Sequence, residues 1–281
     1  MTVLAIANQK GGVGKTTTAI NLGAALARAG RRVLLIDCDP QRNSTSGLGL
    51  AGSAGPTVYD ALAERALLRA CARPTSEERL WLVPASPDLA GAEVELAAAD
   101  AREVRLRRAL ADLRTAYDYV FIDCSPSLGL LTLNALTAAD AALIPVQCEY
   151  LALEGLGQLH DTIKLVRRNL NPALTIAGLV LTMYDSRTNL TEAVAQEVRQ
   201  HFPETFRTVI PRSVRLSEAP SFGKTIFQYA DSSRGAEAYR ALAAELLSRR
   251  AAPPAEPGRR ADPTPAAAGR EAAALTERVI S

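Results

Sequence analysis

The sequence predicts an α/β fold, a mostly parallel twisted β-sheet flanked by helices. Short apolar runs alternate with longer stretches of helical spacing along the first 250 residues. Two of the runs, VLLID at 33–37 and YVFID at 119–123, are continuously apolar, which is typical of strands buried on both faces. With 281 residues, 48% hydrophobic and 22% charged, the chain can bury a full core. Such sheets bind their ligands at the carboxyl ends of the strands.

The first elements form a βαβ unit. The apolar run at 3–8 predicts a strand, residues 16–29 have helical spacing and end at Gly30, and 32–37 is a second strand that ends on a carboxylate. Further strands are expected at 80–83, 119–123, 141–146, 176–182 and 208–210. Helical stretches lie between most of them, so we expect a single domain over residues 1–250.

The composition changes after residue 250. Residues 251–281 contain five prolines and ten alanines, which predicts a disordered tail. This tail lacks the apolar face and basic stripe of a membrane-binding helix. No run approaches the roughly 20 apolar residues of a membrane-spanning helix, and no basic-then-apolar secretory leader precedes the first strand. We therefore expect a soluble, cytoplasmic protein that does not bind membranes.

A glycine-rich loop, NQKGGVGKTT at 8–17, lies between the first strand and the first helix. Glycines let successive N–H groups turn toward phosphate oxygens, and the helix N-terminus adds positive partial charge. In such loops a lysine reaches the β- and γ-phosphates and a hydroxyl ligates Mg²⁺, roles expected of Lys15 and Thr16. The residues expected to contact ATP in this loop are Lys10, Gly11, Gly12, Val13, Gly14, Lys15, Thr16 and Thr17.

The loop departs from the common pattern GxxxxGK[ST], which would place a glycine at position 9. The chain has Gln9 there, followed by Lys10. Lysine is rare in this chain, and nearly every other cation is arginine. Lys10 and Lys15 nevertheless share this tight loop, where a compact ammonium group fits better than a guanidinium. We expect both lysines to act on the nucleotide.

KGGVGKT, with its extra lysine, resembles the deviant Walker A motif of the family that includes the ParA/Soj chromosome-partitioning ATPases, the MinD division-site ATPases and the nitrogenase iron protein. The segments similar to the partitioning subfamily are IDCDPQRNSTSGLG (36–49), AGAEVEL (90–96), DYVFIDCSPSLGLLTLNAL (118–136), PVQCEYLALEGL (145–156) and VIPRSVRLSEAPSFGKTI (209–226). The resemblance covers about residues 1–247 and implies a P-loop NTPase fold. Ser125 stands where the family usually has a proline, which removes no charge or ligand and leaves its effect on the loop open.

The resemblance implies roles for three carboxylates. Asp123 ends an apolar strand, as a Walker B carboxylate does, and is expected to hold Mg²⁺. Asp39 is expected to orient the attacking water, and Asp37 to lie near the metal and support it. The expected catalytic residues are Lys10, Lys15 and Asp39. The expected metal-site residues are Thr16, Asp39 and Asp123.

The resemblance also implies an ATP-dependent homodimer. In the family, the lysine that corresponds to Lys10 crosses to the nucleotide of the other subunit, so ATP is held between two protomers and hydrolysis releases them. Glu149 resembles the residue that contacts the nucleotide ribose across the dimer. Pro211 resembles part of the segment that borders adenine.

The net charge of +2 hides a gradient along the chain. Residues 1–150 carry 15 Lys and Arg against 16 Asp and Glu, whereas residues 151–250 carry 13 against 10. In this basic part, Arg187 and Arg215 match arginines with which partitioning ATPases bind DNA as ATP-bound dimers. Only 5% of residues are aromatic and no recognition-helix motif is present, so we expect phosphate contacts without sequence preference that weaken with salt.

The main hypothesis is a slow ATPase for DNA segregation, cytoplasmic and nucleoid-associated. It would bind non-specific double-stranded DNA and be stimulated by a ParB/Spo0J-type partner. A MinD-like membrane switch would instead need a C-terminal amphipathic helix. An iron-protein-like reductase would need paired interface cysteines, but the four cysteines lack such spacing and are expected in the core. A scaffold that does not hydrolyse ATP would require the loss of Lys15, Asp39 or Asp123. Chromosomal or plasmid cargo is left open.

Overall fold

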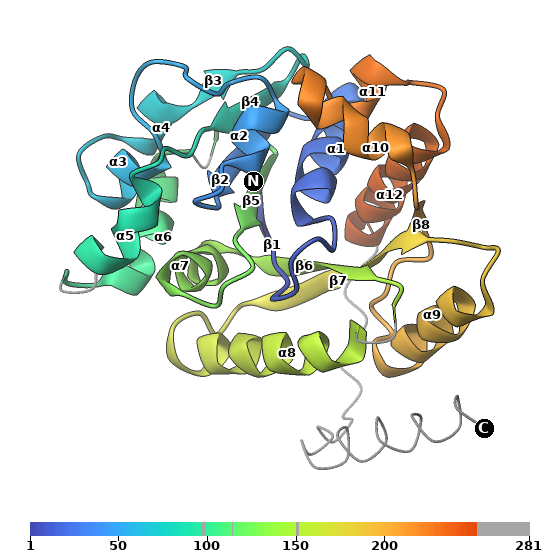
Figure 1. Cartoon of the computed structure of the whole chain (residues 1–281). Coiled ribbons are helices and arrows are strands. Elements are labelled where there is room, and N and C mark those ends of the chain that lie inside the picture. The colour runs from blue at the N-terminus through green and yellow to red at the C-terminus, as the bar shows by residue number, and fades with distance from the viewer. Residues whose placement is uncertain (97–98, 114, 150–151, 252–281) are drawn as a thin grey trace.

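The structure is a computed structural model, and it describes all residues except 97–98, 114, 150–151 and 252–281. An eight-stranded sheet in the order β3-β4-β2-β5-β1-β6-β7-β8 runs through the molecule (Figure 1). The strands are β1 (Thr2–Ile6), β2 (Val33–Cys38), β3 (Arg73–Pro74), β4 (Leu80–Val83), β5 (Tyr119–Cys124), β6 (Ala141–Gln147), β7 (Thr175–Tyr184) and β8 (Val209–Pro211). Their pairings are parallel except for that of β3 with β4. The predicted α/β class with a mostly parallel sheet is therefore confirmed.

Helices connect the strands and cover both faces of the sheet (Figure 1). The α-helices are α1 (Lys15–Arg28), α2 (Asn43–Gly47), α3 (Val58–Leu62), α4 (Leu68–Cys71), α5 (Leu89–Leu96), α6 (Arg105–Ala109), α7 (Leu130–Ala138), α8 (Ala152–Asn169), α9 (Asn189–His201), α10 (Val214–Glu218), α11 (Ile226–Tyr229) and α12 (Arg234–Ala251). Three short 3₁₀ helices are η1 (Arg102–Val104), η2 (Leu110–Leu113) and η3 (Ala219–Phe222).

Two apolar layers hold the sheet between its helices. On one face, α1, α10, α11 and α12 pack against the sheet, and this layer includes the fully buried Leu22, Phe121 and Tyr239. On the other face, α3 to α9 build a second layer around Ile122 and Leu159. β2 and β5 are buried along their whole length because they lie in the middle of the sheet with helices on both sides. Their continuously apolar sequences follow from this position.

The predicted strands and the first helix agree with the structure to within a few residues. β3 was not expected, because two residues at a sheet edge leave no periodic signal. Its second residue, Pro74, has no N–H to donate, and an edge strand tolerates this because no further strand pairs with its outer side. Helix α12 reaches Ala251, and residues 252–281 lie outside the described residues, so the disordered tail stays a prediction. None of the helices in the described part of the chain has the length and apolar character needed to cross a membrane.

Candidate nucleotide-binding site

Three central strands bring the expected site residues to one edge of the sheet. β5 lies between β1 and β2, and its register places Asp123 beside Ile6 on β1 and beside Asp37 on β2. The glycine-rich loop follows β1 directly and leads into α1 (Figure 1). Because the carboxyl ends of parallel strands meet at one edge, the loop and the carboxylates come together there.

The loop has the conformation of a phosphate cradle. Gly12 and Gly14 have φ of 75° and 87°, in the left-handed region that favours glycine. A Cβ added at Gly11 or Gly12 would meet no atom within 4 Å, so the backbone is open to an approaching ligand. Gly14 caps α1, and no side chain accepts hydrogen bonds from the first turn of the helix. These N–H groups can bind an anion.

Neighbouring strands hold the loop from outside. The Asn8 side chain donates a 2.7 Å hydrogen bond to the carbonyl of Pro145 and accepts one of 3.0 Å from the backbone N–H of Lys10. The Thr182 hydroxyl donates a 2.8 Å hydrogen bond to the carbonyl of Val13. Hydrogen bonds to β6 and β7 therefore hold the loop in its conformation, in addition to the bonds within the loop.

Lys15 lies inside the loop at 7% exposure. Its ammonium group donates a 3.1 Å hydrogen bond to the carbonyl of Lys10. Burial lowers the pKa of Lys15, while the negative charges of Asp123 and Asp39 oppose this shift. The ammonium group thus lies in a partly buried, acidic setting, where its charge acts strongly on a nearby phosphate.

Asp37 shapes the segment that carries Asp39. One oxygen of Asp37 accepts hydrogen bonds from the hydroxyl and the N–H of Thr45, at 2.6 and 2.8 Å, and the other accepts one from the N–H of Asp39 at 3.2 Å. Burial raises the pKa of Asp37, although the bonds from Thr45 lower it in part. Asp39, 5% exposed, accepts a 2.9 Å bond from the N–H of Gln41. Asp37 therefore positions Asp39 through the backbone.

Asp123 is fully buried below the loop. Its Oδ2 accepts a 2.7 Å hydrogen bond from the Ser44 hydroxyl. Burial and the nearby charge of Asp37 raise the pKa of Asp123, while the Ser44 and Thr16 side chains lower it in part. The Ser44 bond joins the end of β5 to the segment after Asp39, and Thr16 of the loop lies close by.

This group of oxygens fits Mg²⁺. The Oδ1 atom of Asp123 is buried and has no hydrogen-bond partner among the described residues, although buried carboxylate oxygens are normally satisfied. A divalent cation would balance the charge of Asp123 and use this oxygen, directly or through water. Thr16 and Asp39 both lie close enough to Asp123 to affect its pKa. Mg²⁺ prefers such hard oxygen donors.

The Lys10 side chain pairs with an acidic residue that follows β6 in the same chain. Its ammonium group lies 3.4 Å from Oε2 of Glu149, and the two side chains are 33% and 46% exposed. Pro211 ends β8 and pairs in register with Tyr184. The structure therefore brings Lys10 and Glu149 together, and places Pro211 at the same edge of the sheet as the loop.

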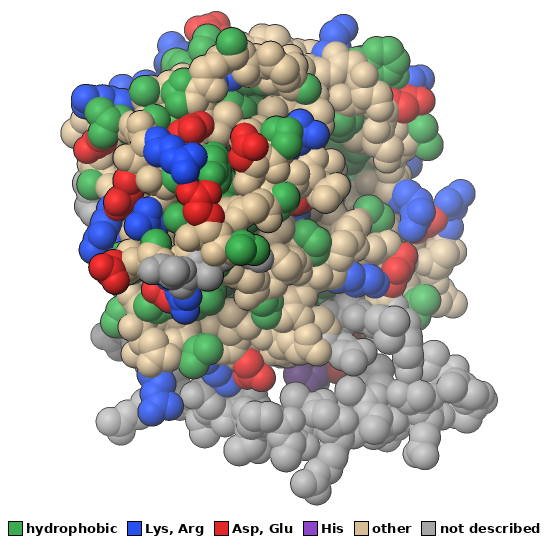
Figure 2. Space-filling view, turned by 60° about the vertical axis from the view of Figure 1, so that its left-hand side comes forward, with side chains coloured by type: hydrophobic (Ala, Val, Ile, Leu, Met, Phe, Trp, Pro, Cys, Tyr) green, Lys and Arg blue, Asp and Glu red, His purple; other side chains and the backbone are tan. Residues whose placement is uncertain are grey.

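The surface carries charges of both signs. On the face shown in Figure 2, acidic and basic side chains are interspersed and form no patch of one sign. The two arginines expected to bind DNA lie at the ligand edge, Arg187 after β7 and Arg215 in α10 after β8. Arg187 is 84% exposed and pairs with Asp185, and Arg215 is 60% exposed and pairs with Glu218.

Three residues of the site were not expected from the sequence. Ser44 and Thr45 hold Asp123 and Asp37, and the run NSTSG directly after the aspartates was a usable signal for them. Thr182 lies in the strand sequence LVLTMY and gave no local signal. It reaches the loop only because β7 and the loop come together in the fold.

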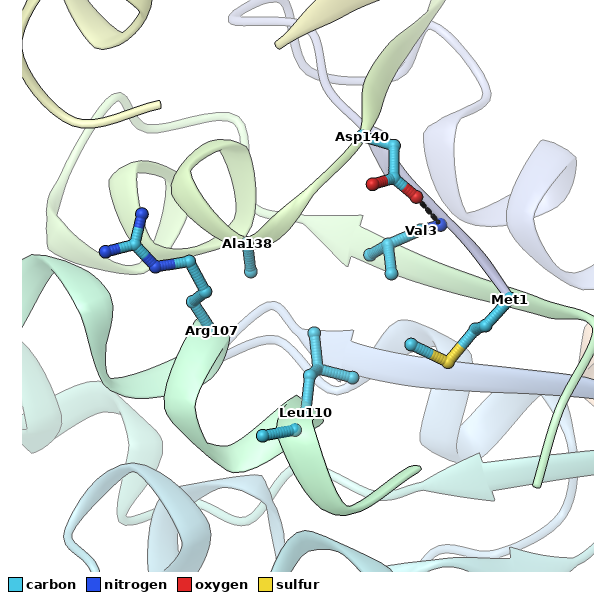
Figure 3. Close-up of a pocket in the computed structure, with 7 residues that line it drawn as sticks. Met1, Val3, Arg107, Leu110, Ala138 and Asp140 are labelled. Carbon is cyan, nitrogen blue, oxygen red and sulfur yellow. Dashed lines mark hydrogen bonds between the residues drawn. The ribbon is translucent and has the colours of Figure 1, made fainter. Parts of the chain in front are cut away.

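A separate cavity of about 210 Å³ lies at the opposite edge of the sheet, where β1 and β6 begin (Figure 3). Met1, Arg107 and Leu110 line it, and Asp140 accepts a 2.8 Å hydrogen bond from the N–H of Val3. This carboxylate therefore holds the start of β1. The cavity belongs to the edge without the glycine-rich loop and is not part of the site.

All four cysteines, Cys38, Cys71, Cys124 and Cys148, are buried and free. The expectation that they are core residues is confirmed. Cys124 follows Asp123 but packs in the core beside Cys38 on β2. An iron-protein-like site therefore gains no support, because a cluster shared by two subunits needs cysteines at the surface.

Comparisons with known proteins give the same fold and name a family. The chain matches the family described as an AAA domain over residues 1–176. A solved cobyrinic acid a,c-diamide synthase from Mycobacterium smegmatis, with bound ATP analog and magnesium, has a TM-score of 0.78 and 42% identity, covering 89% of this chain and 96% of that one. The cell division ATPase MinD of Pyrococcus furiosus has a TM-score of 0.74 and 27% identity, with coverage of 88% and 99%.

Curated relatives are more specific. The chromosome partitioning protein ParA of Myxococcus xanthus is 56% identical over 249 residues, which are 88% of each chain. The sporulation initiation inhibitor protein Soj of Bacillus subtilis is 56% identical over 248 residues, which are 88% of this chain and 98% of that protein. The chain belongs to the ParA/Soj family of chromosome-partitioning ATPases.

Proposed function

We propose that this protein is a DNA-segregation switch that binds ATP with Mg²⁺ and hydrolyses it slowly. The observation that carries the proposal is the convergence of Lys15, Thr16, Asp39 and Asp123 around an open phosphate loop. Lys15 and the N–H groups at the start of α1 bind the β- and γ-phosphates. Thr16, Asp39 and Asp123 hold Mg²⁺, which neutralises phosphate charge when bound. Asp39 orients the attacking water.

The active form is an ATP-bound homodimer. The Lys10 side chain is one-third exposed, and its ammonium group is held by a surface contact with Glu149, so it can turn toward a nucleotide bound by a second copy. Glu149 reaches the ribose of that nucleotide, and Pro211 borders adenine. A cation supplied across an interface to developing phosphoryl charge raises hydrolysis rates by several orders of magnitude in other nucleotide switches.

The dimer binds double-stranded DNA through its phosphates. Arg187 and Arg215 are exposed at the edge that carries the nucleotide, and a dimer presents two sets of them. DNA binding keeps the protein on the nucleoid, and a ParB/Spo0J-type partner releases it by stimulating hydrolysis. The partitioning role is preferred over a MinD-like membrane role because the ParA and Soj relatives are 56% identical, against 27% for MinD. A MinD-like membrane role would need a C-terminal amphipathic helix, and the residues that would have to form it, 252–281, lie outside the described residues.

The deciding experiment measures binding to a mixed-sequence duplex with ATP, with ADP and without nucleotide, over a salt series. We expect tight binding only with ATP, a steep fall with salt, and a slow release of phosphate by the same sample. Arg215→Glu should abolish binding but leave the ATP-dependent dimer intact. Arg31→Glu is the matched control, because Arg31 follows α1 at the opposite edge. Equal DNA binding with ATP and ADP would contradict the proposal.

A further inference from the structure

Three exposed arginines cluster at the ends of β7 and β8, and each is paired with a carboxylate of the same chain. Arg187 lies 2.7 Å from Asp185 and Arg215 lies 3.1 Å from Glu218. The third is Arg212, which follows β8 directly and is 63% exposed. Its guanidinium lies 3.8 Å from Oε1 of Glu149.

Arg212 lies close to the partner of Arg187 and precedes Arg215 by three residues. Its backbone N–H donates a 3.1 Å hydrogen bond to the carbonyl of Tyr184, next to Asp185. Hydrogen bonds from Arg187 hold the pKa of Asp185 below its usual range, and the charge of Arg212 lowers that pKa further. Arg215 follows three residues later on α10. Arg212 therefore connects two arginines from separate segments into one basic cluster.

The carboxylate that pairs with Arg212 differs from the other two in its surroundings. Glu149 also contacts Lys10 of the glycine-rich loop, at 3.4 Å through its second oxygen. The contacts of Asp185 and Glu218 in the described structure are instead to neighbouring residues of the basic cluster and to Tyr229. Glu149 is thus a counter-ion shared between a cation of the nucleotide loop and a cation of the basic cluster.

We propose that Arg212 contacts the phosphate backbone of DNA together with Arg187 and Arg215, and that Glu149 makes this contact depend on the nucleotide state. The proposal rests on the ATP-bound, DNA-binding dimer of the preceding section. When Lys10 and Glu149 both turn to the nucleotide of the second copy, Arg212 loses its ion pair with Glu149. Its guanidinium can then turn to a DNA phosphate without any movement of a strand or helix.

The chemistry of the cluster favours a phosphate backbone. Guanidinium groups bind phosphate oxygens through paired N–H donors, and three of them at neighbouring strand ends suit the repeated phosphate charge of a duplex. The effect of Glu149 on DNA affinity is modest, because the Arg212 and Glu149 side chains are exposed and solvent screens the attraction between them. We expect the release of Arg212 from Glu149 to change DNA affinity by up to about fivefold.

The first test compares wild type, Arg212→Gln and the control Arg31→Gln in ATP, by titration of a labelled mixed-sequence duplex over a salt series. One phosphate contact contributes a slope of about −0.9 to the dependence of log K on log salt, so the loss of two contacts per dimer should reduce the slope by about 2. Arg31→Gln should leave it unchanged. ATP-dependent dimerisation, followed by size-exclusion chromatography, should be the same in all three.

An unchanged slope in Arg212→Gln would overturn the proposal while wild type still binds DNA with ATP. If wild type itself failed to bind DNA with ATP, the proposed function would be wrong. A variant that binds DNA normally but no longer responds to a partner protein would assign Arg212 to a protein contact, which also overturns the proposal.

The second test addresses the role of Glu149 in nucleotide-free protein. Glu149→Gln should raise DNA affinity by up to about fivefold, and this gain should be lost in the double variant Glu149→Gln/Arg212→Gln. Glu78→Gln controls for the change in net charge, because Glu78 is 89% exposed before β4, at the opposite edge. If Glu149→Gln raised DNA affinity equally with and without Arg212, Glu149 would act only through the net charge of the protein. That result would contradict its proposed role as a counter-ion of Arg212.

Discussion

The hydroxyl of Thr182, at the end of β7, donates a 2.8 Å hydrogen bond to the backbone carbonyl of Val13 in the glycine-rich loop. Thr182 is 3% exposed, and a Cβ at Gly14 would lie 3.7 Å from its methyl group. Its own carbonyl accepts a hydrogen bond from Cys148, next to Glu149. The following residue, Met183, has a φ of 51°, unusual for a residue other than glycine. One buried threonine thus ties the phosphate loop to the strand ends beside it.

Thr182→Val should weaken binding of ATP and ADP alike. The change keeps the volume but leaves the carbonyl of Val13 buried without a donor, which costs about 1–3 kcal/mol, equivalent to about five- to 150-fold in affinity. Because ground state and transition state lose the same interaction, KM should rise while kcat changes little. Fluorescent-nucleotide titration and phosphate release measure both, and Thr182→Ser should restore binding.

Thr137→Val is the matched control for Thr182. Thr137 is 1% exposed on α7, and its hydroxyl has no hydrogen-bond partner in the part of the chain that the structure describes. Removing it should leave nucleotide affinity unchanged and should not lower the melting temperature. Normal nucleotide affinity in Thr182→Val would show that the hydrogen bond to Val13 does not position the loop.

Lys10→Ala should bind ATP but lose ATP-dependent dimerisation. The loop keeps Lys15 and its N–H groups for its own nucleotide, whereas the cation for the second copy is gone. By analogy with arginine fingers, turnover should fall by about 10³-fold or more. Nucleotide titration and size-exclusion chromatography separate the two effects, and a dimer of the variant in ATP would refute the role of Lys10 in trans.

Asp39→Asn should trap the ATP-bound dimer on DNA. Asn keeps an oxygen that can accept the hydrogen bond from Gln41, so the segment stays in place while the charge is lost. Loss of a group that orients or activates water costs about 100-fold or more in rate. Single-turnover hydrolysis and the lifetime on DNA test this, and unchanged turnover would remove Asp39 from the mechanism.

Asp123→Asn should stabilise the nucleotide-free protein more at about pH 8 than at about pH 5. Burial raises the folded-state pKa of Asp123 above its unfolded value, so the stability that this carboxyl contributes is full at low pH and is lost as pH rises through the folded pKa. Asn stays neutral and avoids that loss. Thermal unfolding with a chelator at both pH values measures the difference, and an equal effect at both would contradict the shifted pKa.

Much of the fold could be predicted from local pattern. The continuous apolar runs of β2 and β5 indicated strands buried on both faces of a mostly parallel sheet, and the loop sequence indicated a phosphate site. Lys15, Thr16 and Asp123 could be assigned because each lies in a motif directly after a strand or at its end. Edge strand β3 could not be predicted, since two residues carry no period and their pairing with β4 depends on the rest of the sheet.

The sequence by itself determined the chemistry available to this protein: a phosphate loop with two lysines, carboxylates at two strand ends, and a basic second half. The tertiary structure alone decided which of these groups meet. Thr182 holds Val13 across 169 positions of sequence, and Glu149 lies between Lys10 and Arg212. Such pairings have no local signature, because they depend on the order in which parallel strands assemble and on where their carboxyl ends bring distant loops together.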